Sequence, residues 1–216
     1  MSNTHDSITG KSLRELIGSL QIVDHKQAAK GHLEQAIWRW FHDQDRTVVA
    51  EPSAIHTLAV AAQGILSTVA RESKQQPSPL MKGVEAQPAH VKNWLRNPQN
   101  FFKHGNYRNQ GKRKWVSHLP DLTELIMADN VGMFNRLFGI TSALLELFLL
   151  RYSLSFPTSG ISLKTFEMKL IERGHDLQAL AKLGRREFYE TVLPYAIEVA
   201  TDLKRFHSRK SSLESA

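Results

Sequence analysis

Hydrophobic residues recur every three or four positions along much of the chain, which is the spacing of one face of an α-helix. The clearest stripe lies within residues 29–45 and consists of Leu33, Ala36, Ile37, Trp40 and Phe41. A similar stripe lies within residues 53–73 and consists of Ile55, Leu58, Ala59, Ala62, Ile65, Leu66 and Val69. Pro52 and Ser53 form a start signal for this second segment. The pattern therefore predicts two amphipathic helices.

The middle of the chain combines a loop with two further helical patterns. Residues 74–88 are rich in proline and glutamine, which favours a loop. Residues 89–105 and 119–139 have helical patterns; in the second, Asp121 is expected to cap the helix, with Glu124 completing a capping box. We expect Gly139 to end that helix.

Residues 141–153 are apolar on nearly every side, which predicts a central, buried helix. A break follows at residues 155–160, and residues 162–210 predict one short helix and one or two longer ones, with a kink at Pro194. No segment has a convincing strand pattern. The sequence therefore predicts an all-α helical bundle with a C-terminal helical extension. The expected parts are an N-terminal helical arm (1–25), the bundle (26–155), the extension (156–210) and a disordered tail (211–216).

Composition limits the class of protein. Hydrophobic residues make up 41% of the 216 positions and charged residues 23%, as expected of a globular protein. The absence of cysteine excludes disulfides, zinc–cysteine sites and a cysteine nucleophile, and it fits a cytoplasmic location. The N-terminus lacks the pattern of a signal peptide. The most apolar window, residues 140–150, is shorter than the roughly 20 residues that span a bilayer, so we expect no membrane partner.

Charge indicates a negatively charged partner, because the formal net charge is +7. Residues 103–115 contain five cations and no acid, together with Tyr107 and Trp115. Cations neutralise phosphates, and exposed aromatic rings stack on unpaired bases. The expected contacts to RNA or DNA are Lys103, Tyr107, Arg108, Lys112, Arg113 and Lys114. The alternative is a solvated loop in which Trp115 anchors the next helix.

The best candidate for chemistry is the pair Asn100 and His104, which share a face if residues 97–105 are helical. A histidine exchanges protons near neutral pH, and an amide binds a phosphate or a base edge. Arg96 lies one turn from this pair if the helix continues through Pro98. Alternatively, the pair only caps a helix end, where the dipole favours a protonated histidine. The other histidines have no regular spacing with acids, so neither a metal site nor a cofactor is expected.

The segment "QNFFKH", residues 99–104, resembles the motif of the HEPN superfamily, small bacterial and archaeal helical proteins that include many toxin and defence ribonucleases. That motif is an arginine, a polar residue and then a histidine, and the match here is at Asn100 and His104. A looser resemblance to bacterial helical proteins with an "NFFKH"-type core covers roughly residues 28–140. The resemblance implies metal-independent RNA cleavage and a homodimer whose two motifs face each other. However, Gln99 stands where the family has its arginine, which implies weak or absent cleavage.

Two functions follow from these features. The first is a nucleic-acid-binding protein of HEPN-like type, with weak or no RNase activity, in a defence or toxin-like role. The alternative is a non-enzymatic helical protein that dimerises or docks to a larger assembly. In both cases the basic residues would form a contact surface.

Overall fold

The computed structural model describes residues 24–42, 50–93, 120–139, 142–161 and 163–214, with only the backbone of residues 50–52 and 203–214. Most of these residues are helical and none is in a strand, which confirms the all-α class. The helices are α2 (His25–His42), α3 (Ala50–Glu72), α4 (Pro79–Glu85), α6 (Pro120–Phe138), α7 (Ala143–Ser155), the 3-10 helix η1 (Pro157–Ser159), α8 (Lys164–Glu172), α9 (Leu177–Lys182) and α10 (Arg185–Glu214).

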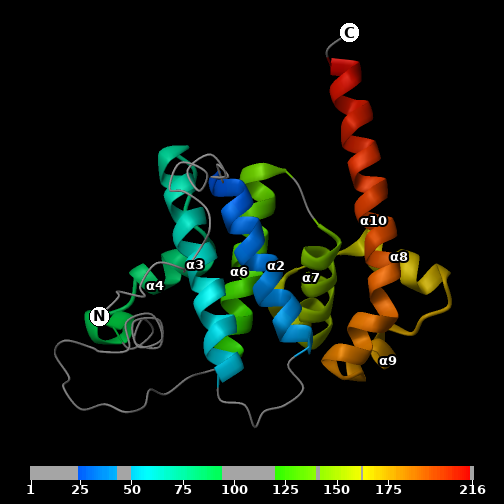
Figure 1. The fold of residues 1–216 in the computed structure, drawn as a ribbon, viewed down its shortest axis with the longest axis horizontal. Helices are drawn as coiled ribbons and strands as arrows, with labels where there is room; N and C mark the ends of the chain where they lie inside the picture. Colours follow the sequence, from blue (N-terminus) through cyan, green and yellow to red (C-terminus); the bar gives the residue numbers. More distant parts are fainter. Residues whose placement is uncertain (1–23, 43–49, 94–119, 140–141, 162, 215–216) are drawn as a thin grey trace, which may run out of the picture.

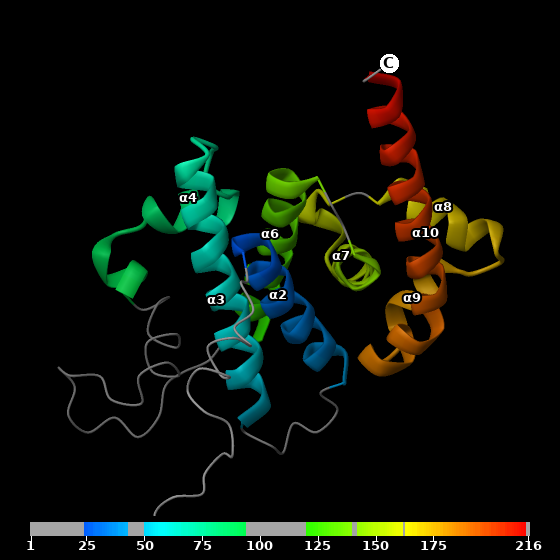
Figure 2. The same cartoon turned by 45° about the horizontal axis from the view of Figure 1, so that its top comes forward.

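Helices α2, α3 and α6 pack against one another, and α7 lies between them and α10 (Figures 1 and 2). The hydrophobic stripe predicted for α2 is buried at all five of its positions. The stripe of α3 is buried or partly buried throughout. Burying these stripes against each other removes apolar surface from water, which is the main force that holds such helices together.

Helix α7 is the central helix that its all-round apolar pattern predicts. The hydroxyl of Ser142 accepts a hydrogen bond from the backbone N–H of Leu145 (3.4 Å) and caps its first turn. Every residue from 145 to 150 is buried. Because α7 contacts α2, α6, α9 and α10, it has few sides open to solvent.

Two local predictions are wrong. The segment 74–88 is not simply a loop, because α4 lies within it: Ser78 caps α4, accepting from the backbone N–H of Met81 (3.1 Å), and Pro79 occupies the first turn. Asp121 is not a cap, because α6 already begins at Pro120. The prediction for Gly139 is confirmed: it ends α6 with a φ of +61°, a conformation that glycine adopts without strain.

The C-terminal third of the chain forms two short helices, α8 and α9, and one long helix, α10. Pro194 lies inside α10 without ending it. Phe166, Phe188 and Val192 belong to the same hydrophobic core as α2 and α7, so this region packs directly onto the bundle. The last part of α10 projects beyond the bundle (Figures 1 and 2), and its backbone is helical through Glu214, which includes residues 211–214.

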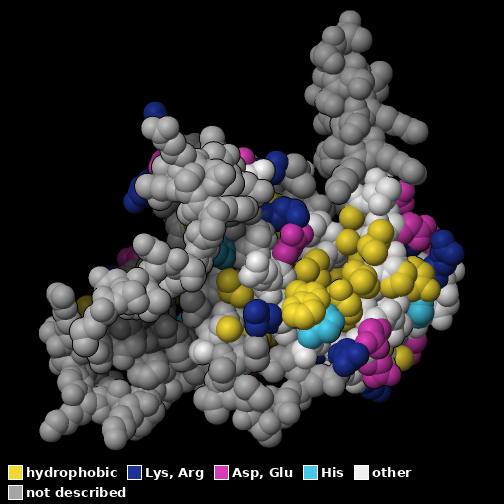
Figure 3. Space-filling view, in the orientation of Figure 1, with side chains coloured by type: hydrophobic (Ala, Val, Ile, Leu, Met, Phe, Trp, Pro, Cys, Tyr) yellow, Lys and Arg dark blue, Asp and Glu magenta, His cyan; other side chains and the backbone are white. Residues whose placement is uncertain are grey.

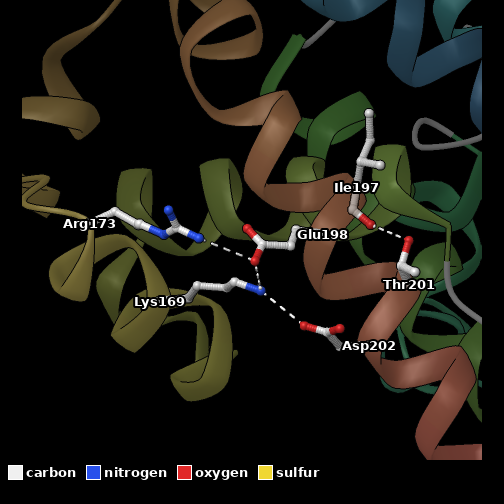
Figure 4. Close-up of polar contacts among 6 residues, drawn as sticks. All are labelled: Lys169, Arg173, Ile197, Glu198, Thr201 and Asp202. Carbon is white, nitrogen blue, oxygen red and sulfur yellow. Dashed lines mark hydrogen bonds and ion pairs between the residues drawn. The ribbon is translucent and has the colours of Figure 1, made fainter.

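Ion pairs join α8 to α10 (Figure 4). The ammonium group of Lys169 lies 2.9 Å from Glu198 and 3.0 Å from Asp202, and Arg173 lies 3.3 Å from Glu198. Burial disfavours the charged form of Lys169, but hydrogen bonds and attraction from the two carboxylates outweigh it and raise the pKa of Lys169. The pairs therefore complement the apolar contacts of Phe166 and Leu170 and fix α8 along α10.

Candidate functional site

Every residue that the sequence nominates for function falls in residues 94–119, outside the described part of the chain. The candidates for chemistry are Arg96, Asn100 and His104. The candidates for nucleic-acid contact are Lys103, Tyr107, Arg108, Lys112, Arg113 and Lys114. Their roles, and the homodimer that the resemblance implies, stay predictions.

Within the described residues, a pocket of about 210 Å³ lies between α3, α4 and α6. Helices α3 and α4 lie on the side of the bundle away from α10 (Figure 1). Its α3 wall is formed by His56, Val60, Gln63, Gly64 and Ser67. Its other walls are formed by Leu80, Met81 and Val84 of α4 and by Leu122 and Ile126 of α6. The pocket thus has one wall with several polar groups and two apolar walls.

His56 is fixed at one end of the α3 wall. It is almost fully buried, and its Nδ1 lies 2.9 Å from the hydroxyl of Thr123 on α6, which is also buried. A lone histidine on an apolar face of a helix is either a ligand or a hydrogen-bonded core residue. The contact with Thr123 confirms that His56 is buried and hydrogen-bonded, so it contributes to the packing of α3 on α6.

Helix α4 is fixed to α6 by polar contacts. Asp129 accepts hydrogen bonds from Ser78 and from the backbone N–H of Leu80 (3.3 Å). Burial raises the pKa of Asp129, although these hydrogen bonds and the positive charge of Arg136 act in the opposite direction. Arg136 also donates to the backbone carbonyl of Gln76 (2.9 Å). The α4 wall of the pocket is therefore held in place by residues of α6.

A second polar cluster centres on Glu124, which is 9% exposed. Its carboxylate accepts a hydrogen bond from Nε1 of Trp40 (2.9 Å) and forms an ion pair with Arg185. The guanidinium of Arg185 also lies over the ring of Trp40, 4.3 Å from its centroid. These contacts join α6, α2 and α10, and they give the buried indole N–H and the carboxylate a partner each. The cluster is therefore best explained as a structural link between helices.

Arg151 of α7 extends this link to α9. Its guanidinium donates to the backbone carbonyls of Leu180, Ala181 and Leu183, which lie at the end of α9. The last carbonyls of a helix have few partners within it, and among the described residues only that of Leu180 also accepts from a nearby backbone N–H, that of Leu183 (3.2 Å). The arginine therefore supplies donors to this helix end. Burial and the neighbouring Arg185 lower the pKa of Arg151. An arginine stays protonated at physiological pH even so, and Arg151 acts here as a fixed donor.

Sequence reasoning missed both Glu124 and Asp129 as long-range contacts. Glu124 was assigned to a capping box, whereas its partners are 84 and 61 residues away in the chain. Asp129 lies 49 residues from Leu80. The available signal was that each acid lies on the apolar side of an otherwise amphipathic helix, which a buried polar contact explains.

The described ranges contain no group of three or more histidine, aspartate or glutamate side chains arranged to hold a metal ion.

Residues 53–72, within α3, form a segment that is long and apolar enough to cross a membrane. A core helix of a soluble protein passes the same test, and α3 packs against α2 and α6.

The fold thus defines an all-α protein with a pocket between three helices and a structural polar cluster. Comparison with known proteins adds no further assignment: no protein-family model, curated protein or solved structure matches this chain.

Proposed function

We propose that this protein binds nucleic acid through its basic residues, in the manner of a HEPN-like protein whose RNase activity is weak or absent. The distribution of charge carries the proposal. Residues 94–119 contain six lysines and arginines and no acid, whereas the whole chain has a net charge of +7. A single stretch of sequence therefore accounts for most of the positive surplus, which is typical of a phosphate-binding segment.

The basic stretch, residues 94–119, connects two helical parts of the bundle. The stretch follows helical residues 89–93 and leads directly into α6 at Pro120. A second group of cations, Lys204, Arg205, Arg209 and Lys210, belongs to the part of α10 that projects from the bundle (Figure 1). A projecting helix has space for a large partner on several sides.

Replacing Lys112, Arg113 and Lys114 by alanine is expected to weaken binding to single-stranded RNA about equally for all sequences, because these residues would bind phosphates. The salt dependence should also flatten, by about 0.7 in the log–log slope for each phosphate that the variant no longer binds. Fluorescence anisotropy over a salt series measures both quantities. The matched control replaces three exposed cations of the described helices, Arg71, Lys164 and Lys182. Equal weakening in the two variants would show that only total charge matters.

Cleavage is tested separately, with single-stranded RNA in the presence of a chelator. We expect low or no activity from the natural sequence, because Gln99 leaves the developing phosphate charge without a cation. The substitution Gln99→Arg should raise the activity, and His104→Ala should abolish it without changing the melting temperature. Asn100→Ala should reduce it, because the substrate would be positioned less accurately. Activity that His104→Ala does not change would exclude this site.

A second candidate function is that of a non-enzymatic interaction protein, and exposed hydrophobic side chains favour it. Met168, Ile171, Ile197 and Trp38 are each 49–59% exposed. Hydrophobic side chains gather on one face of the molecule, over the region of α10 (Figure 3). Such side chains are common in protein interfaces. A protein that sediments as a dimer and does not bind RNA at low salt would favour this function over the first.

A further inference from the structure

The polar side chains that line the pocket between α3, α4 and α6 lie on one wall only, that of α3. The hydroxyl of Ser67 is buried and has no hydrogen-bond partner in the described part of the chain. The carboxamide of Gln63, one turn earlier on the same face of α3, is half-buried and lines the same wall. A buried polar group without a partner costs free energy, and the amide of Gln63 beside it offers donors and an acceptor to a ligand in the pocket.

We propose that this pocket binds a neutral, planar heteroaromatic molecule with the size of a purine base. The volume of about 210 Å³ is consistent with this size, because a cavity of about 150 Å³ is sufficient for benzene. Gly64 lies between Gln63 and Ser67 and leaves space, since a Cβ atom at this position would meet nothing within 4 Å. A fused two-ring molecule can therefore lie along α3.

The chemistry of the walls selects the class of ligand. Leu80, Met81 and Ile126 offer apolar contact to the faces of a flat ring, and a methionine thioether packs well on aromatic rings. The amide of Gln63 offers both donors and an acceptor to a ring edge that carries nitrogen atoms. No lysine, arginine, aspartate or glutamate lines the pocket, so a charged ligand would lose its hydration without gaining an opposite charge.

The pocket is also preorganised. Asp129 and Arg136 of α6 hold α4 and the residues that precede it, as described above. Thr123 holds His56 at the end of the α3 wall. Because the walls are already fixed, ordering them costs a ligand little free energy. The proposal does not depend on nucleic-acid binding, because it concerns a free small molecule.

The test uses the full chain with free adenine as the probe and toluene as an apolar control, and it measures affinity by calorimetry and melting temperature. Adenine is expected to bind and to raise the melting temperature of the natural protein. Gly64→Leu should weaken adenine binding at least tenfold, because the new side chain occupies the pocket. This variant should fold well, since leucine favours a helix over glycine. Gly31→Leu, the same change on α2, is the matched control and should leave binding unchanged.

A second variant tests the polar wall. Gln63→Leu should weaken adenine binding about tenfold while leaving toluene binding equal or stronger, because only adenine uses the amide. The proposal is overturned if adenine does not bind at millimolar concentration. It is also overturned if Gly64→Leu binds adenine as the natural protein does, or if toluene binds as tightly as adenine. RNA binding by the basic residues is measured separately, so its failure would leave these results intact.

Discussion

Leu147→Asp is expected to lower the free energy of unfolding by about 4 kcal/mol or more, enough to unfold a marginally stable domain. Leu147 lies in the centre of α7 and is 0% exposed. A carboxylate at this position would lose its hydration among apolar side chains. Urea denaturation followed by circular dichroism would measure the change, or show that the variant is already unfolded.

The matched control is Met168→Asp on α8, where the side chain is 59% exposed. The same chemical change at an exposed position should cost about 0.5 kcal/mol or less. Leu144 provides an intermediate case. The apolar pattern of residues 141–153 does not distinguish Leu144 from Leu147, but Leu144 is only partly buried, so Leu144→Asp should cost less than Leu147→Asp. A normal melting temperature in Leu147→Asp would show that α7 does not lie in the core.

The sequence could predict the main helices because the information for them is local. The five apolar positions of α2 are close in the chain, and burial of one face is sufficient to select that pattern. Helix α7 was recognised for the opposite reason, since it has apolar residues on every side. The short helix α4 was missed, because its seven residues are too few for a periodic pattern. Its signal was the pair Ser78 and Pro79, a cap followed by a first-turn proline.

The pocket could not be predicted, because it depends on contacts between distant segments. Its walls come from three helices, and the distance between α3 and α4 depends on how Asp129 and Arg136 hold α4. One sign was visible in the sequence: Gln63 and Ser67 lie four residues apart on α3 and share a face. That spacing alone does not distinguish a solvated face from the wall of a pocket. The roles of Asn100 and His104 stay predictions.

Glu124→Ala is expected to lower the free energy of unfolding by about 3 kcal/mol. Its carboxylate is the acceptor for the indole N–H of Trp40 and the ion-pair partner of Arg185. Removing it leaves the indole N–H without a partner and the guanidinium without an opposite charge, and both lie at the junction of α2, α6 and α10. Urea denaturation of the purified variant measures the effect.

Two further variants separate the contributions to this effect. Glu124→Gln keeps an acceptor for Trp40 but removes the charge, so it should be less severe than Glu124→Ala. Burial and the charge of Glu124 raise the pKa of Tyr152, so Glu124→Gln should lower that pKa, which a spectrophotometric titration measures. Glu190→Ala is the matched control, because its ion pair with Arg186 is exposed on both sides and should contribute less than about 1 kcal/mol.

A double-mutant cycle of Glu124→Ala with Trp40→Phe tests whether these residues act together. If the hydrogen bond between them stabilises the junction, the effects of the two changes should be non-additive by at least about 0.5 kcal/mol. Independent, additive effects would contradict the contact between α6 and α2. The cycle matters for the fold, because the link through Glu124 joins helices that are far apart in sequence. Hydrophobic patterning alone would not fix the position of these helices relative to one another.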